Sequence, residues 1–80
     1  MSEYIAGLLA ANVRKLLDEK GWSQLKLADE SGIRAPAINR VMKGTHPPAA
    51  KTLQKIADAL GVEPYLLLIP PDPKPAKNKK

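Results

Sequence analysis

The chain has 80 residues, of which 44% are hydrophobic, so it can form one small domain and has no room for a second. It contains no cysteine, which excludes disulfide bonds, thiolate metal sites and thiol nucleophiles. The formal net charge is +5, no apolar run approaches the roughly 20 residues that span a bilayer, and the N-terminus lacks a signal-peptide layout, so we expect a soluble, cytoplasmic protein.

The first predicted element is an amphipathic helix over residues 4–19. Its apolar residues recur at spacings of three and four: Ile5, Leu8, Leu9, Val13, Leu16 and Leu17. Lys20 and Gly21 form a C-terminal stop signal.

A short second helix is predicted from the N-cap Ser23 to about Glu30. Trp22 precedes the cap and can pack on Leu27, as in a hydrophobic staple. Gly32 then permits the left-handed backbone of a tight turn, and the apolar Ile33 after it is typical of a turn between two crossed helices.

Three further helices complete the prediction. The third runs from Ala35 to Lys43, because Pro36 is favourable in a first turn and Gly44 ends the helix. The fourth ends at Gly61, and its buried face is marked by Leu53, Ile56, Ala57 and Leu60. A last short helix begins at Val62-Glu63-Pro64 and reaches about Leu68.

Residues 70–80 contain four prolines and four lysines and have nothing to bury, so we expect a disordered tail or linker after a folded domain at residues 1–69. No segment shows the alternation of a strand. The predicted class is therefore all-α, with five helices.

The distribution of charge is more informative than its sum. The tail contributes +3, leaving +2 for residues 1–71. Residues 31–57 contain no acid, and their five basic residues are Arg34, Arg40, Lys43, Lys51 and Lys55. Such a segment predicts a positive surface for a phosphate backbone; the alternative is a solvated basic face without a partner.

Three groups of residues follow one another in a fixed order: Gln24-x-x-Leu27-Ala28-x-x-x-Gly32-Ile33, then Ile38 and Gly44, then Pro48-x-x-x-x-Leu53-x-x-Ile56-Ala57-x-x-Leu60-Gly61-Val62. This order resembles the Cro/cI-type (XRE-like) helix-turn-helix family of phage and bacterial repressors, over residues 8–68. The resemblance implies a five-helix, lambda-repressor-like domain that places its third helix in the major groove of operator DNA. A helical core with the same pattern and no DNA-binding role is the alternative.

The resemblance also implies roles for individual residues. The positions that face the bases are Arg34, Ala35, Pro36, Asn39 and Arg40, while Ile38, Val41 and Met42 face inward. Asn39 suits adenine and Arg40 suits guanine, and a phosphate contact is the alternative for either side chain. Ala35 and Pro36 offer only apolar surface, for example to a thymine methyl group. The positions that contact phosphate are Gln24, Lys43, Thr45, His46 and Lys51. Plain solvent exposure is the alternative for Gln24.

The chain departs from the family at two positions. Family members often bury an arginine late in the first helix against a glutamate late in the third, and here these positions are Leu17 and Met42. Because both charges are replaced together by apolar side chains, we expect the same packing to survive.

The last predicted helix is richer in apolar residues than a short helix normally buries, with Tyr65, Leu66, Leu68 and Ile69. We expect them to form a homodimer interface, in keeping with two-fold symmetric operators. The alternative is that they close the base of the core.

No catalytic or metal site is predicted. His46 is the single histidine and has no cysteine or acid close by in sequence, and Ser23 lacks a base that could activate it. We therefore expect no cofactor and no enzymatic activity. The prediction is a DNA-binding transcription regulator, most simply a repressor on a palindromic operator. The alternatives are an antitoxin-type protein that binds a toxin partner and represses its own operon, and a helical adaptor without DNA.

Overall fold

Four α-helices and one 3-10 helix follow one another along residues 2–70, which are the residues that the computed structural model describes. They are α1 (Ser2–Lys20), α2 (Gln24–Ser31), α3 (Ala35–Lys43), α4 (Ala50–Leu60) and the 3-10 helix η1 (Pro64–Leu67). This part of the chain contains no strand, which confirms the all-α prediction.

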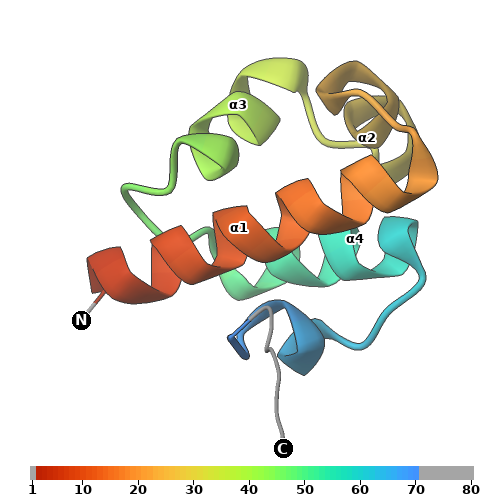
Figure 1. Cartoon of the computed structure of the whole chain (residues 1–80). Coiled ribbons are helices and arrows are strands. Elements are labelled where there is room, and N and C mark those ends of the chain that lie inside the picture. Colours follow the sequence, from red (N-terminus) through yellow and green to blue (C-terminus); the bar gives the residue numbers. More distant parts are fainter. Residues whose placement is uncertain (1, 71–80) are drawn as a thin grey trace, which may run out of the picture.

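The helices enclose one core. α1 packs against α3, α2 packs against both α3 and α4, and η1 packs against α1 and α4. In Figure 1, α1 crosses the front of the molecule, with α2 and α3 on one side of it and η1 on the other. The fully buried side chains at the centre come from every element: Leu9, Val13, Leu27, Ile38, Ile56, Leu60 and Leu67. Because every element contributes to this core, α3 is held by contacts with both α1 and α2 rather than by its loops alone.

The buried face of α1 differs in part from its predicted apolar stripe. Leu9, Val13 and Leu17 are buried as predicted, but Ile5, Leu8 and Leu16 are only half-buried. Ala6, Ala10 and the polar Asn12 are buried in addition. The reason is that α1 approaches its neighbours closely, and small side chains fit there better than leucine or isoleucine.

α1 and the end of α3 approach each other closely. Gly44 has the left-handed φ of +70°, and a Cβ built on it would lie 3.3 Å from both the Cβ of Ala10 and the Cα of Gly7. Two features therefore favour glycine at position 44: the left-handed backbone conformation and the limited space for a side chain.

Leu17 and Met42, the two positions that depart from the family's charged pair, are both buried in the same hydrophobic cluster. Their burial agrees with the expectation that the packing survives the joint loss of both charges. Two apolar side chains avoid the cost of removing two charges from water.

Asn12 connects α1 to the C-terminal segment. Only 6% of its surface is exposed, and its Nδ2 donates hydrogen bonds to the carbonyl oxygens of Leu67 at 2.8 Å and Ile69 at 2.7 Å. Both N–H groups of the amide are therefore used. This contact fixes the main chain that carries the apolar side chains around η1.

The predicted fifth helix is not an α-helix but a 3-10 turn, and it ends one residue before the predicted Leu68. Residues Pro64–Leu67 form a single 3-10 turn, in which Leu66 N–H bonds to the Glu63 carbonyl and Leu68 N–H to the Tyr65 carbonyl, both at 3.0 Å. Pro70 follows after two residues, and a proline prevents the residue before it from adopting helical backbone angles. Pro70 therefore limits any continuation of the turn to Leu68.

Trp22 marks the junction of α1 and α2. Its ring is half-buried against the core, and the ammonium groups of Lys20 and Lys26 lie 5.2 Å and 5.6 Å from the ring centroid. The favourable placement of a cation over an indole supports this packing.

The expected disordered tail lies outside the described residues, apart from Pro70. Within residues 2–70, no helix is both long enough and apolar enough to cross a membrane.

Candidate nucleic-acid interface

The turn between α2 and α3 holds the two helices in a defined relation. Gly32 adopts the left-handed φ of +76°, and its N–H donates to the Ala28 carbonyl at 3.0 Å. The Oγ of Ser31 accepts a hydrogen bond from the N–H of Ile33 at 3.2 Å, and Ile33 packs against the core. The direction of α3 is therefore set by local bonds as well as by burial.

α3 has two clearly different sides. Ile38, Val41 and Met42 are buried, which confirms the predicted inward face. The residues predicted to read bases are all exposed, both on the helix and at its N-cap: Arg34, Ala35, Pro36, Asn39 and Arg40. The structure thus brings this set together on the solvent side of one helix of nine residues.

The N-terminal end of α3 is unusual for a helix that meets solvent. Arg34 occupies the N-cap and makes no capping hydrogen bond with its side chain, and Pro36 contributes no N–H group to the first turn. This end therefore offers a guanidinium group and apolar surface rather than a row of backbone donors.

The first turn of α2 contains the predicted phosphate residue Gln24. Ser23 caps this helix, since its Oγ accepts from the N–H of Lys26 at 3.0 Å, which confirms the predicted N-cap. Gln24 is half-buried, and its amide has no hydrogen-bond partner within residues 2–70. The backbone N–H groups of a helix's first turn favour an anion, so a phosphate oxygen could meet both the amide and the main chain here.

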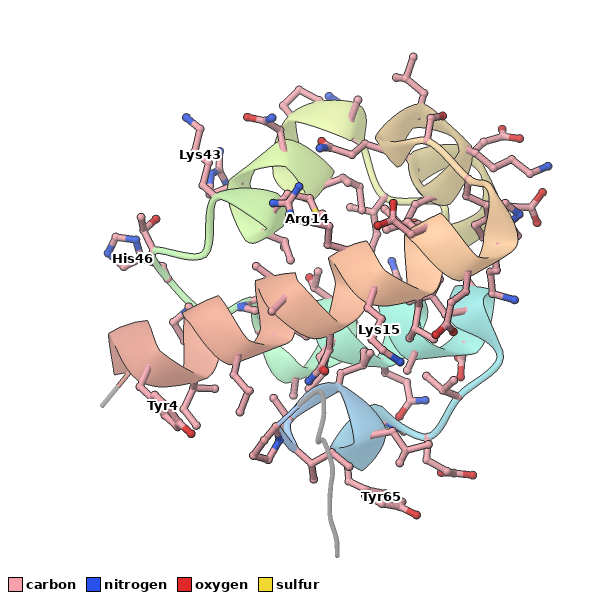
Figure 2. The ribbon with its side chains drawn as sticks, in the orientation of Figure 1. Tyr4, Arg14, Lys15, Lys43, His46 and Tyr65 are labelled. Atoms are coloured by element: carbon pink, nitrogen blue, oxygen red, sulfur yellow. The ribbon has the colours of Figure 1, made fainter. Side chains whose placement is uncertain are left out.

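The loop after α3 brings the other predicted phosphate residues to one end of the molecule. Lys43, Thr45 and His46 are exposed, and the Nδ1 of His46 lies 3.3 Å from the Oγ1 of Thr45. Figure 2 shows Lys43 and His46 projecting from this end, away from the core. Lys51 is exposed in the first turn of α4.

The ion pairs of the described residues lie outside this surface. Lys15 pairs with Glu19 and Lys26 with Glu30, each at 2.9 Å, on α1 and α2. The hydrogen bond and the charge of Glu30 raise the pKa of Lys26. In the part of the chain that the structure describes, none of the five basic residues within 31–57 forms an ion pair. Their charges remain available to an external anion.

Two site features were missed at the sequence level. The Nη2 of Arg14 on α1 donates to the Met42 carbonyl of α3 at 3.2 Å, across 28 residues of sequence. Leu25 on α2, beside Gln24, is 71% exposed. The local pattern contained no signal for the Arg14 contact, because only the packing of α1 on α3 brings the two groups together.

No metal chemistry is indicated by the arrangement of side chains. Among the described residues, His, Asp and Glu nowhere gather in a group of three that could hold a metal ion.

Comparison with known proteins supports the helix-turn-helix resemblance. Residues 13–67 match the sequence pattern of the helix-turn-helix family. A Neisseria meningitidis protein named Neisseria hypothetical transcription factor is 37% identical over 67 residues, covering 84% of this chain and 63% of that protein. An uncharacterized HTH-type transcriptional regulator, y4dJ of Sinorhizobium fredii, is 32% identical over 68 residues, covering 85% of this chain and 88% of that protein.

A third curated relative is longer than this chain. The HTH-type transcriptional regulator SutR of Escherichia coli is 29% identical over 69 residues, covering 86% of this chain but only 39% of that protein. The chain therefore spans less than two thirds of the Neisseria protein and of SutR.

Solved structures agree with the fold. The crystal structure of the hypothetical transcription factor NHTF from Neisseria superposes with a TM-score of 0.80 at 35% identity, covering 89% of this chain and 80% of that one. An HTH_3 family transcriptional regulator from Vibrio cholerae gives a TM-score of 0.77 at 21% identity, covering 84% and 38%, and supports the fold alone. With the turn geometry, the two-sided α3 and the match over residues 13–67, this chain belongs to the helix-turn-helix family of the Cro/cI type, whose members are DNA-binding transcription regulators and not enzymes.

Proposed function

We propose that this chain is a sequence-specific transcriptional repressor that binds a two-fold symmetric operator as a homodimer, with α3 in the major groove. The observation that carries the proposal is the exposed side of α3, which joins a turn of fixed geometry and lies within an acid-free segment. A nine-residue helix is roughly 13 Å long, so its exposed side can reach the bases of about one half-site.

The proposed base contacts come from few side chains. Asn39 can bond adenine at N6 and N7, and Arg40 can bond guanine at O6 and N7. Arg34 adds a third polar group at the N-cap, while Ala35 and Pro36 can contact a thymine methyl group. Only Arg34, Asn39 and Arg40 can form hydrogen bonds to bases, so recognition depends strongly on each of these three side chains.

The proposed phosphate contacts surround this helix. Gln24 lies before it in the chain, and Lys43, Thr45, His46 and Lys51 follow it. Contacts on both sides of α3 would fix its register in the groove without reading sequence.

Selection of bound sites from random duplex DNA tests the function directly, and two variants then separate base reading from phosphate binding. We expect Arg40→Ala to lower affinity for the selected site by roughly tenfold to a hundredfold and to relax the preference at one base pair per half-site. We expect Lys43→Ala to weaken selected and unrelated DNA alike and to lower the slope of log affinity against log salt by about 1 per bound half-site.

Lys15→Ala is the matched control, since it removes a positive charge from the side of α1 that faces away from α3 (Figure 2). Lys15 pairs there with Glu19. It should leave the site preference unchanged. An unaltered preference in Arg40→Ala would remove its base-reading role, and an unaltered salt slope in Lys43→Ala would remove its phosphate contact.

The proposed dimer surface consists of Tyr65, Leu66, Leu68 and Ile69. Tyr65 is 63%, Leu66 38% and Ile69 46% exposed, whereas Leu68 is partly packed against the core. Exposed apolar side chains close together are typical of a protein interface. Tyr65 lies on the side of the molecule away from α3, so a dimer formed there could leave both α3 helices free for DNA (Figure 2).

We expect sedimentation to show a concentration-dependent dimer that Leu66→Arg weakens, because an arginine in the interface would lose its hydration. Leu25→Arg, which adds the same charge on an exposed leucine of α2, is the control for self-association. A wild-type protein that remains monomeric at high concentration, both free and on a palindromic site, would exclude the dimer.

A further inference from the structure

Arg14 makes a contact that the proposed function does not use. Its Nη2 donates to the main-chain carbonyl of Met42 at 3.2 Å. The last four carbonyl groups of a helix have no partner within the helix, and Met42 is one residue from the end of α3. The Gly44 N–H bonds to the neighbouring carbonyl of Val41, so Arg14 supplies a partner that the turn itself does not.

The charge of Arg14 also suits this position. The C-terminal end of a helix is the negative end of its dipole, and a cation there is stabilising. Figure 2 shows Arg14 extending from α1 on the side that faces α3. Within residues 2–70, Arg14 forms no ion pair, so no acid competes with the carbonyl for the guanidinium group.

One face of α1 therefore holds the end of α3. Gly7 and Ala10 lie against Gly44, and Arg14 bonds to Met42 one turn further along α1. Residues three and four apart lie on the same side of a helix, so these three contacts form a single row. Leu17 continues this row into the core cluster that also contains Met42.

The bond reaches the position at which the chain departs from its family. Met42 replaces the acid of the family's buried pair, and Leu17 replaces the arginine. Arg14 lies three residues before Leu17 and links a guanidinium group to the backbone of Met42 rather than to a side chain.

We propose that Arg14 is a positioning residue for DNA recognition: it fixes the C-terminal half of α3, so that Asn39 and Arg40 meet the bases in one register. The inference rests on the proposed role of α3. Paired hydrogen bonds to a base need their donors within about half an ångström of the productive position, whereas lysine contacts to phosphate tolerate a shift of the helix. Loss of the bond should therefore reduce specific binding more than nonspecific binding.

The test compares three variants on the selected site and on a scrambled duplex over a range of salt concentrations. Arg14→Met keeps an aliphatic stem but no donor, Arg14→Lys keeps a charged donor, and Lys15→Met removes one charge from the other side of α1. We expect Arg14→Met to bind the selected site about tenfold more weakly than Lys15→Met, with equal affinity for scrambled DNA and an equal salt slope. Arg14→Lys should recover most of the loss.

Two results would overturn the proposal. One is equal binding of the selected site by Arg14→Met and Lys15→Met. The other is an equal loss on both duplexes in Arg14→Met with a salt slope lower by about 1, which would identify a phosphate contact instead. Since Arg14 is exposed, Arg14→Met should fold; if it does not, Arg14→Gln, which is too short to reach the carbonyl, takes its place with the same expected result.

Failure of the proposed function can be distinguished from failure of the positioning role of Arg14. In that case the wild-type protein itself shows no preference between the selected and scrambled duplexes. If the wild-type protein discriminates and Arg14→Met discriminates equally well, only the positioning role is wrong.

Discussion

Asn12→Leu is expected to lower the free energy of unfolding by about 3 kcal/mol, although it places a leucine in a nearly buried site. The two side chains share the same branched arrangement of four heavy atoms, and apolar burial alone would favour leucine. However, the Nδ2 of Asn12 donates to the carbonyl oxygens of Leu67 and Ile69, and leucine would leave both without a partner. The sign of the change in the free energy of unfolding therefore shows whether the lost hydrogen bonds or the added apolar burial dominates.

Equilibrium unfolding in urea measures this change through the transition midpoint. Asn39→Leu is the matched control, because Asn39 is exposed on α3 and the same replacement there should change stability by less than about 0.5 kcal/mol. A more stable Asn12→Leu protein would show that the two bonds contribute little. The variant should also weaken the proposed dimer, because Asn12 fixes the main chain that carries Ile69.

Gly44→Ala is expected to be equally costly, at about 3 kcal/mol. An L-residue at a φ of +70° costs about 1 kcal/mol or more. The added Cβ would also lie 3.3 Å from Ala10 and Gly7, where α1 has little freedom to move because its other side is packed in the core. Both costs apply at the same position.

Gly61→Ala separates the two costs. Gly61 has a φ of +75°, but a Cβ there would meet nothing within 4 Å, so only the backbone cost of about 1 kcal/mol should remain. Thermal or urea unfolding of both variants gives the difference, which reports the contact between α1 and the end of α3. If both substitutions cost the same, that contact is not tight.

Much of the fold could be predicted because local chemistry specifies it. Ser23 caps α2, Gly32 closes the turn, and Pro36 lies in the first turn of α3, as the sequence rules for helix ends require. The bounds of α3 agree at both ends. The exposed face of α3 was implied by the family resemblance, and Ile38, Val41 and Met42 occupy the buried side as expected.

The missed features depend on tertiary contacts. Asn12 is polar, so the sequence pattern did not mark it as a core residue. Its two acceptors lie 55 and 57 residues away along the chain, and only the fold brings them to its side chain. Ala6 and Ala10 carry a weak hydrophobic signal, so the predicted stripe emphasised Ile5 and Leu8, although the close approach of Gly44 selects the smaller residues. Contacts of this kind leave no periodic pattern in one sequence.

The last element shows a limit of a different kind. Pro64 suggested the start of a helix, but the segment forms a single 3-10 turn at Pro64–Leu67, and Pro70 follows two residues later. Packing on the core was only the alternative to a dimer interface for this segment, and Leu67, which is fully buried, was not named. Apolar content could not predict the 3-10 backbone.

Trp22 gives this protein a built-in optical reporter. It is the single tryptophan of the chain, and it lies at the junction of α1 and α2 with two lysine ammonium groups near its ring. Its fluorescence reports on the packing that orients the helix-turn-helix, away from α3 and its proposed base contacts. Unfolding exposes the ring to water and shifts its emission to longer wavelength, so the stability of every variant can be followed without an attached dye.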